Sequence, residues 1–242
     1  MSDVRVPKLA PFTTTASRLE LVERFFAGTG PSYDWIVNAT TLGADRRWKR
    51  AIVDAIPAHA ERILDLASGT GILTFAIAER FPGARVVGVE LRDEYLQLAR
   101  RRAAALGYEG VQFVLSRAED YAPAEPCDAI VSSYLAKYAE LPALARNGRA
   151  MLRPGGVLVM HDFSYPSTPR TERYWKLQFA AIRLLGATAF RPWRTAFDGL
   201  PELIRRTRWV AELPECLRRE GFRDIRVEEL SKHGATMVSA RV

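Results

Sequence analysis

The residues with the clearest chemical potential lie in the stretch ILDLASGTGILTFAIAERF, which begins at Ile63. An acid, Asp65, stands in an apolar run, and the small residues after it include Gly69 and Gly71. Two glycines let the backbone approach a ligand closely and enter a helix near Ile72 without a clash from a Cβ atom. The amides at the start of that helix then face the bound molecule. The stretch therefore predicts a binding loop between a strand and a helix.

Two cofactors fit such a loop, and Thr74 distinguishes them. A dinucleotide loop has a third glycine three residues after the second, where pyrophosphate and helix packing leave no room for a side chain. Here that position is Thr74. S-adenosylmethionine (SAM) has no pyrophosphate, and Asp65 can lie near the ammonium of its amino-acid tail. Glu90 closes the next apolar run, where a carboxylate can accept hydrogen bonds from both ribose hydroxyls. The combination favours SAM over NAD.

His161 is the leading candidate for a general base. It follows the residues VLVM at the carboxyl end of the fifth apolar run, and this is the edge at which open α/β sheets bind their ligands. An imidazole titrates near neutral pH, which suits proton transfer. The alternative is a histidine packed against the sheet. Asp162 either orients a catalytic group or caps the next turn, whereas His59 and His233 are predicted to be peripheral.

Aromatic residues gather in two segments outside the predicted binding fold. The first is YDWIVNATTLGADRRWKR, residues 33–50, and the second extends from about 169 to 209. Tryptophans usually fill a core, but five apolar runs already supply one. We therefore predict an N-terminal helical lid over cofactor and acceptor, and a helical insert that forms the opposite wall. The aromatic residues concerned are Tyr33, Trp35, Trp48, Tyr174, Trp175, Phe179 and Phe190.

From residue 62 onward, short apolar runs alternate with amphipathic stretches. The runs are RILDLA, ARVVGVEL, VQFVLS, CDAIVSSY and GVLVMHDF, and the stretches ILTFAIAERF, EYLQLARRRAAALG and LPALARNGRAML show helical spacing. Such runs form parallel strands with helices on both faces of the sheet. The closing residues FRDIRVEELSKHGATMVSARV predict two more strands, joined by a turn around residues 232–234. The predicted fold is α/β and Rossmann-like, with a seven-stranded, mostly parallel sheet that ends in an antiparallel hairpin.

Composition excludes several functional classes. The net charge is +7, but the arginines are scattered through alanine-rich helices, so we predict no nucleic-acid partner. Two cysteines are too few for a disulfide framework or a thiolate metal site, and we predict no metal. No apolar run is long enough to cross a bilayer, and the start lacks the apolar stretch of a signal peptide. We expect a cytoplasmic protein whose positive surface favours transient contact with anionic membranes.

Taken together, the glycine loop, the acid Glu90 and the terminal hairpin resemble the class I SAM-dependent methyltransferases from Asp65 onward. Within that class, the chain resembles the ubiquinone/menaquinone C-methyltransferases of the UbiE type. DLASGTG resembles that family's DLAxGTG, DFSYP resembles its EFSxP, and LRREGFRDIRVEELSKHG resembles its closing helix and strand. The family's entry region is matched without a gap at Tyr33, Asp34, Gly43, Trp48 and Lys49, and also at Phe26.

This resemblance implies cofactor contacts at Thr74, Glu90, the pair Arg117–Ala118, and Ser133. With the loop and its neighbours, the predicted SAM-binding residues are Tyr33, Asp65, Ala67, Ser68, Gly69, Gly71, Thr74, Glu90, Leu91, Arg117, Ala118, Glu119 and Ser133.

Two departures from the family pattern fall near the site. At Arg117 the family usually has Asp or Asn for the adenine amino group, and an arginine has no acceptor. Glu119, Asp120 or a backbone carbonyl must then take that role. After Ser133 the family reads FGLRNV where this chain reads YLAKYA. This register sets Lys137 and Tyr138 where the family has arginine and asparagine. Lys137 could stabilise a phenolate as a point charge.

The catalytic candidates are therefore His161, Lys137 and Tyr134, and the first hypothesis is C-methylation of a quinol or similar phenol, such as a prenylated quinol. O- or N-methylation of another small metabolite is an alternative that the YLAKYA segment supports. An inactive SAM-binding module and an NAD-dependent oxidoreductase are weaker alternatives. The predicted segments are a lid at residues 1–60 and a methyltransferase domain at 61–242. The sequence does not determine the oligomeric state.

Overall fold

A computed structural model describes residues 15–231 and 234–242, and its centre is a seven-stranded sheet of order β3-β2-β1-β4-β5-β7-β6. Strands β1 to β5 are parallel, β7 runs antiparallel to β5, and β6 runs antiparallel to β7. The predicted sheet and terminal hairpin are confirmed. Residues 232–233 of the predicted turn, including His233, lie outside the described residues. The strands are β1 (Arg62–Leu66), β2 (Arg85–Glu90), β3 (Val111–Leu115), β4 (Cys127–Ser133), β5 (Leu152–Phe163), β6 (Arg223–Ser231) and β7 (Ala235–Arg241).

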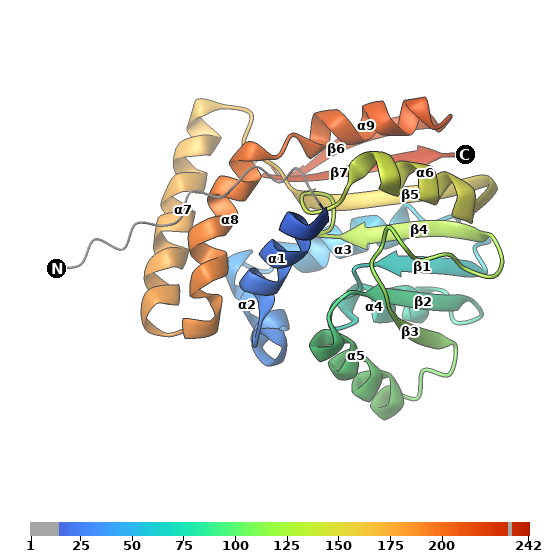
Figure 1. Cartoon of the computed structure of the whole chain (residues 1–242), viewed down its shortest axis with the longest axis horizontal. Coiled ribbons are helices and arrows are strands. Elements are labelled where there is room, and N and C mark those ends of the chain that lie inside the picture. Colours follow the sequence, from blue (N-terminus) through green and yellow to red (C-terminus); the bar gives the residue numbers. More distant parts are fainter. Residues whose placement is uncertain (1–14, 232–233) are drawn as a thin grey trace.

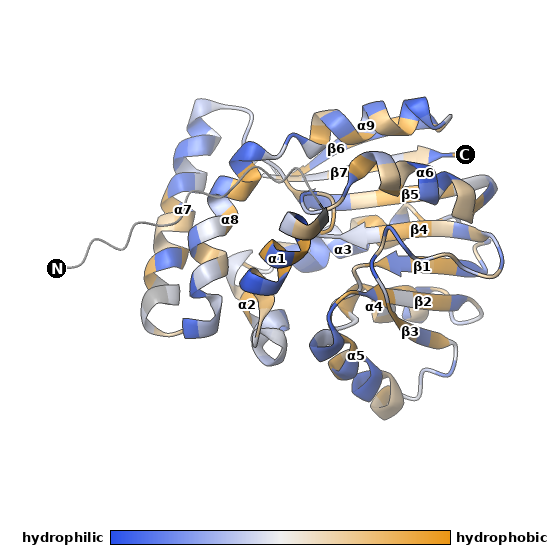
Figure 2. Ribbon diagram, viewed as in Figure 1, coloured by the Kyte–Doolittle hydropathy of each residue, from blue (hydrophilic) through white to orange (hydrophobic). Residues whose placement is uncertain are grey.

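Helices pack on both faces of the sheet, as its continuous apolar strands require. One face carries α3 (Ala44–Asp54), α4 (Ile72–Arg80) and α5 (Asp93–Leu106). The other carries α6 (Leu141–Met151) and α9 (Trp209–Arg219), which also pack on each other. Apolar residues follow the central strands in Figure 2. The core therefore lies in two layers, one on each side of the sheet.

Four helices gather at the edge where the parallel strands end (Figure 1). They are α1 (Thr15–Phe26), α2 (Tyr33–Thr40), α7 (Pro169–Thr188) and α8 (Arg194–Arg206), with the short 3₁₀ turns η1 (Gly30–Ser32) and η2 (Arg191–Trp193). We call this group the cap. Its two halves are far apart in the sequence, at residues 15–40 and 169–206, and they meet where Trp193 Nε1 donates a hydrogen bond of 2.8 Å to Ser32 Oγ.

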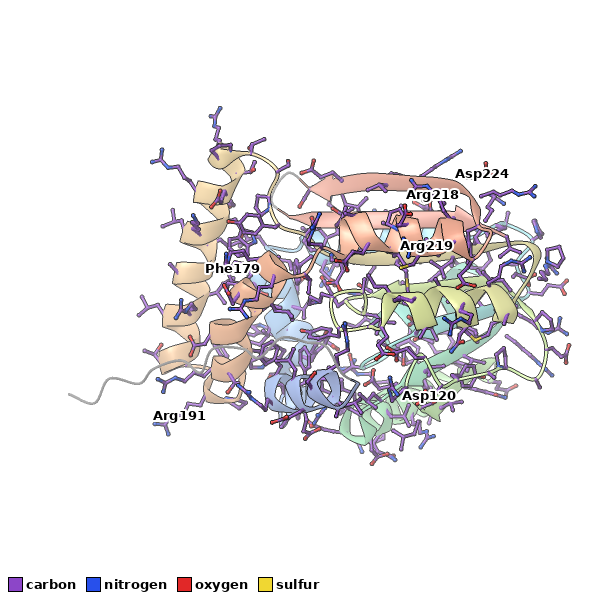
Figure 3. The ribbon with its side chains drawn as sticks, turned by 45° about the horizontal axis from the view of Figure 1, so that its top comes forward. Asp120, Phe179, Arg191, Arg218, Arg219 and Asp224 are labelled. Atoms are coloured by element: carbon purple, nitrogen blue, oxygen red, sulfur yellow. The ribbon has the colours of Figure 1, made fainter. Side chains whose placement is uncertain are left out.

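The cap has an apolar interior of its own. Phe179, labelled in Figure 3, packs with Trp175 and Ile204 between α7 and α8. The ring centroids of Trp175 and Phe179 are 4.5 Å apart. The same aromatic side chains that hold the insert together also line a cavity beneath it.

Two elements lie close to the bounds of the predicted segments. Helix α3 lies inside the predicted lid segment, but Ile52 and Val53 pack against the sheet, so this helix belongs largely to the core. The insert ends at Arg206 rather than near 209, because Trp209 begins α9 and is buried on the sheet. Its indole N–H donates to the carbonyl of Phe163 over 2.7 Å, the partner that a buried indole needs. The division into segments 1–60 and 61–242 stays a prediction.

Candidate active site

The loop after β1 owes its shape to its small residues. Gly69 and Gly71 have φ angles of +59° and +89°, in the left-handed region that favours glycine. A Cβ atom at Gly71 would lie 2.6 Å from the ring of Phe75. The strand before the loop ends at Leu66, and the helix after it begins at Ile72 as predicted.

Glu90 ties this loop to the end of β2. One carboxylate oxygen accepts a hydrogen bond of 2.8 Å from the amide of Gly69, and the other accepts one of 2.8 Å from the amide of Arg92. Burial raises the pKa of this carboxyl above its ordinary value, and the two backbone donors oppose that shift. Each oxygen retains a second lone pair, which can accept a further hydrogen bond. Glu90 is therefore placed to bind a diol.

Asp65 is a buried carboxyl with one unpaired oxygen. Its Oδ2 accepts a hydrogen bond of 2.6 Å from Thr74 Oγ1, whereas Oδ1 has no partner among the described residues. Burial raises the pKa of Asp65 to about 7, and Thr74 and the charge of Lys49 oppose that shift. A buried oxygen without a partner is costly. Asp65 is thus arranged to accept hydrogen bonds from a cationic ligand.

Two adjoining cavities surround these acids. The larger, of about 110 Å³, lies between the glycine loop, the ends of β2 and β3, and α1; we call it the loop cavity. The smaller, of about 20 Å³, contains Asp65, Ser68 and Lys49; we call it the Asp65 pocket. Of the predicted cofactor residues, those lining one or both are Tyr33, Asp65, Ala67, Ser68, Gly69, Glu90, Leu91, Arg117, Ala118, Glu119 and Ser133. Gly71 and Thr74 are not lining residues; Gly71 shapes the loop, and Thr74 acts through Asp65.

Arg117 does not offer its side chain as an acceptor, and its guanidinium points to two neighbouring acids. The distances are 3.2 Å to a carboxylate oxygen of Asp120 and 3.6 Å to one of Glu119. Glu119 lines the loop cavity, while Asp120 is not among the lining residues. Of the two acids predicted to accept a hydrogen bond from the adenine amino group, Glu119 is therefore the one that lies on the cavity.

A third cavity, of about 260 Å³, lies under the cap; we call it the cap cavity. Its lining is mostly apolar and aromatic, and includes Trp48, Phe163 and Trp193. Four aromatic residues line both this cavity and the loop cavity, so the two spaces meet at one aromatic wall. These wall residues are Phe26, Tyr33, Tyr134 and Tyr138.

Lys137 places a buried cation on the lining of the cap cavity. Its ammonium forms an ion pair with Asp162 and lies 4.6 Å from the ring centroid of Tyr138. Burial lowers the pKa of Lys137, and the negative charge of Asp162 opposes that shift. Asp162 also accepts hydrogen bonds from the amides of Lys137 and Phe163, over 3.0 and 2.7 Å. Of the two roles predicted for Asp162, the orientation of a catalytic group agrees with these contacts.

His161 lies inside β5 rather than at its end, because the strand continues to Phe163. Its Nδ1 is 3.0 Å from Ser133 Oγ, and its ring packs against Trp48 and Tyr134 at centroid distances of 5.3 and 5.2 Å. Burial and two lysines lower the pKa of His161 well below its usual value, so the imidazole is neutral. His161 does not line the three cavities described above. A role in proton transfer would therefore pass through Ser133, whose hydroxyl lies within hydrogen-bond distance of Nδ1.

Sequence reasoning missed two contributors to the site. Leu19 and Val22 of α1 line the loop cavity, and their spacing in TASRLELVERFF carries the helical signal that could have found them. Asp45 accepts a hydrogen bond of 2.7 Å from the hydroxyl of Tyr134. No local pattern marks Asp45, because its partner is 89 residues away in the chain. No cluster of metal-binding side chains occurs within residues 15–231 and 234–242.

The chain was compared with known proteins and structures. A model of the methyltransferase domain family matches residues 58–194. Demethylmenaquinone methyltransferase from Thermus thermophilus is 38% identical over 144 residues, which cover 58% of this chain and 65% of that relative, just under two thirds of its length. The ubiquinone/menaquinone biosynthesis C-methyltransferase UbiE from Syntrophotalea carbinolica is 30% identical over 224 residues, or 88% of this chain and 91% of that protein.

The solved structures show the same fold. Phosphoethanolamine N-methyltransferase 2 from Haemonchus contortus, in complex with S-adenosyl-L-methionine, aligns with a TM-score of 0.66 at 15% identity. The alignment covers 93% of this chain and 59% of that one. At this level of identity the likeness concerns the fold alone.

Proposed function

Because the chain belongs to the class I SAM-dependent methyltransferases, and within them to the UbiE-type family, we propose that it methylates a ring carbon of a quinol or related phenol. The cofactor is SAM, which supplies an electrophilic methyl group from its sulfonium. The remaining steps depend on the chain's own residues, which must bind and align the acceptor, exclude water and move protons.

The acids at the glycine loop fit this cofactor. SAM carries an ammonium, and Asp65 Oδ1 is a buried acceptor without a partner among the described residues. SAM also carries a ribose diol, and Glu90 has lone pairs left after binding the amides of Gly69 and Arg92. Lys49 lines the Asp65 pocket and would attract the carboxylate of the amino-acid tail. We therefore assign the tail to the Asp65 pocket and the adenosine to the loop cavity.

The aromatic wall is the observation that carries the proposal for the acceptor. A methyl group must pass directly from one bound molecule to the other, and the wall is where the two cavities meet. Aromatic side chains bind a planar ring by stacked or edge-to-face contacts. The apolar lining of the cap cavity disfavours highly charged acceptors, because they would lose their hydration. A phenol or quinol combines a flat ring with low charge.

Lys137 is placed to stabilise the phenolate oxyanion that C-methylation requires. Loss of the phenolic proton makes the neighbouring ring carbon nucleophilic, and a nearby cation stabilises the resulting oxyanion. Lys137 is a buried cation on the cap cavity, held by Asp162. His161 contacts Ser133 and the ring of Tyr134, so we assign it to the orientation of those two residues.

A fourth cavity supports an acceptor with an apolar tail. This outer cavity, of about 340 Å³, lies between α2 and α7 and shares Ile36, Tyr174 and Ile182 with the cap cavity. Gln178 lines both spaces, and its Nε2 donates a hydrogen bond of 2.9 Å to the carbonyl of Thr40. An isoprenoid chain on the ring could extend from the cap cavity into the outer cavity, with a prenylated quinol as the expected acceptor.

The proposal is tested by incubating the protein with SAM and a short-chain demethylquinol, and by locating the new methyl group by NMR. We expect a methyl group on a ring carbon. A methyl group on oxygen would favour the O-methyltransferase alternative, which the YLAKYA segment supports. Thermal shifts with SAM, S-adenosylhomocysteine and NAD serve as the binding control, and we expect stabilisation by the first two only.

A further inference from the structure

We propose that Tyr134 and Asp45 form a proton relay for the hydroxyl group of the acceptor. In this relay Tyr134 is a catalytic residue that touches the acceptor, and Asp45 is a positioning residue that acts through Tyr134. The inference rests on the proposed function, because it needs a phenolic acceptor in the cap cavity.

Tyr134 lies at the junction of the cavities. Its side chain lines the loop cavity, the Asp65 pocket and the cap cavity, so it lies where cofactor and acceptor meet. Its φ angle is +72°, an unfavourable value for a bulky residue. The amide of Tyr134 donates to the carbonyl of His161 over 2.8 Å, and its ring stacks on Phe163 at 4.9 Å. The surrounding structure thus holds a strained residue at the junction, as functional sites often do.

Asp45 supplies the second member of the pair. It lies in the first turn of α3, is buried, and accepts the Tyr134 hydroxyl over 2.7 Å. Its carboxylate also pairs with Lys49, one turn later on the helix, which compensates for the burial of its charge. The neighbouring residues Ala44, Arg47 and Trp48 line the cap cavity. Asp45 therefore stands beside the acceptor space but behind Tyr134.

The hydroxyl of Tyr134 is a departure from the pattern of the family that the chain resembles. The UbiE-type family reads FGLRNV where this chain reads YLAKYA, so Tyr134 stands at the position of a phenylalanine. A phenylalanine offers a ring but no hydroxyl. The added oxygen hydrogen-bonds to a buried carboxylate 89 residues away, which a merely space-filling substitution would not need.

The relay balances protons and electrons. The acceptor's O–H proton passes to Tyr134 Oη, while the Tyr134 proton passes to Asp45 Oδ1. Electron density moves into the ring, whose carbon takes the methyl group as the carbon–sulfur bond of the cofactor breaks and its electron pair stays on sulfur. Water at the cavity mouth accepts the proton that leaves the methylated carbon. Asp45 then returns its proton through Tyr134 to the ring oxygen, so one proton is released per turnover.

Tyr134 is suited to pass a proton on without ionising. Burial and the charge of Asp45 raise its pKa well above the usual value for tyrosine, so its own hydroxyl remains protonated at rest. A hydroxyl can donate one hydrogen bond and accept another at the same time. The charged or titratable groups that face the pair are Lys49, Lys137, Asp162, His161 and Tyr33.

The test compares wild type, Tyr134→Phe and Asp45→Asn on a series of substituted phenols of increasing acidity. With weakly acidic phenols we expect kcat to fall by about 100-fold or more, the usual size of a general acid–base contribution. With phenols that are already ionised at the assay pH the loss should shrink to a few-fold, because no proton needs to be taken. Tyr134→Phe retains the ring that stacks on Phe163. It therefore tests the relay even if Asp45→Asn, which leaves Lys49 without its anion, folds poorly.

Tyr108→Phe is the matched control, because Tyr108 also donates to a carboxylate, Glu79 Oε1, over 3.1 Å on a remote surface. It should retain both the wild-type kcat and the wild-type affinity for S-adenosylhomocysteine, measured by calorimetry. An equal loss across the whole phenol series would assign Tyr134 a structural role and overturn the relay. A wild-type protein that methylates none of the phenols would instead overturn the proposed function.

Discussion

At the scale of single residues, Asp65 shows how the free protein prepares for its cofactor. Burial raises the pKa of this carboxyl to about 7, because the hydrogen bond from Thr74 and the charge of Lys49 only partly oppose the loss of hydration. In the free protein the folded state therefore binds a proton more tightly than the unfolded chain does. The contribution of Asp65 to the free energy of unfolding is therefore fully present below the ordinary carboxyl pKa, and it is lost as the pH rises through 7. An ammonium beside Asp65 would reverse this balance by favouring the ionised form.

We predict from this balance that the binding of S-adenosylhomocysteine depends on pH. Only ionised Asp65 pairs well with the ligand's ammonium, which stays protonated between pH 5 and 7. The dissociation constant should rise by roughly tenfold per pH unit below the pKa of Asp65. Titration calorimetry at pH 5.5, 6.5 and 7.5 measures this slope. Asp65→Asn should bind more weakly and show almost no slope; an equal slope in both proteins would assign the titration to another group.

The residues at the site differed in how far their sequence context identified them. Asp65 and Glu90 lie in local patterns that a strand, a turn and a helix impose, so their positions could be predicted. Asp45 could not be predicted, because only the folded chain brings it to Tyr134. His161 was predicted from its place in the run GVLVMHDF, but that pattern does not show that its side chain is buried and lies off the cavity linings.

At the scale of elements, α8 packs against α1, the helix that forms one wall of the loop cavity. A Cβ atom at Gly199 of α8 would lie 2.5 Å from the ring of Phe25 of α1. The same helix α1 supplies Arg18, Leu19 and Val22 to the lining of the loop cavity. A change that moves the two helices apart should therefore weaken the binding of the cofactor.

We predict that Gly199→Ala destabilises the protein by about 1–3 kcal/mol, the usual effect of an overpacked core. It should also weaken the binding of S-adenosylhomocysteine, because α1 moves away from the cavity. Urea unfolding and calorimetry measure the two effects. Gly83→Ala is the control, since a Cβ atom there would meet no atom within 4 Å. Unchanged affinity alongside lowered stability would show that α1 is not coupled to the cofactor site.

The elements of the sheet were predictable, and the assembly of the cap was not. Buried parallel strands appear as continuous apolar runs, so β1 to β5 and their helices could be located from pattern alone. The cap helices are amphipathic too, but the spacing of their apolar residues does not indicate which element each apolar face packs against. Helix α3 therefore seemed part of the lid, although its apolar side packs on the sheet.

At the scale of the whole molecule, an apolar surface surrounds the outer cavity. Trp35, Leu42, Leu177 and Leu184, on or just after α2 and on α7, are all exposed. The chain carries a net charge of +7, and none of the helices in the described part is long and apolar enough to span a membrane. A positive protein with an exposed apolar face can bind reversibly to an anionic membrane surface. We propose that this face makes the transient contact, where a lipid-dissolved acceptor would enter.

We predict that the protein co-sediments with vesicles of anionic phospholipid and less with neutral vesicles, and that added salt weakens the binding. Leu184→Glu should reduce the binding by about tenfold, because a leucine that enters the lipid contributes more than 1 kcal/mol. Leu106→Glu is the matched control, as Leu106 is similarly exposed, at 63% against 69% for Leu184, but ends α5. Equal loss in both variants would mean that charge alone governs the contact.

The contact between Ser32 and Trp193 joins two parts of the cap that the ribosome synthesises at different times. These two residues are 161 positions apart, yet they join the halves of the cap. At usual rates of synthesis the first half waits roughly 10 to 30 s before its partner has been translated. During that interval Phe25 and Ile36 lack the part of their apolar cluster that the second half supplies, namely Ile182, Trp193, Ala196, Phe197 and Leu203. The nascent chain should therefore depend on chaperones at its amino-terminal segment, until the last third of the protein emerges.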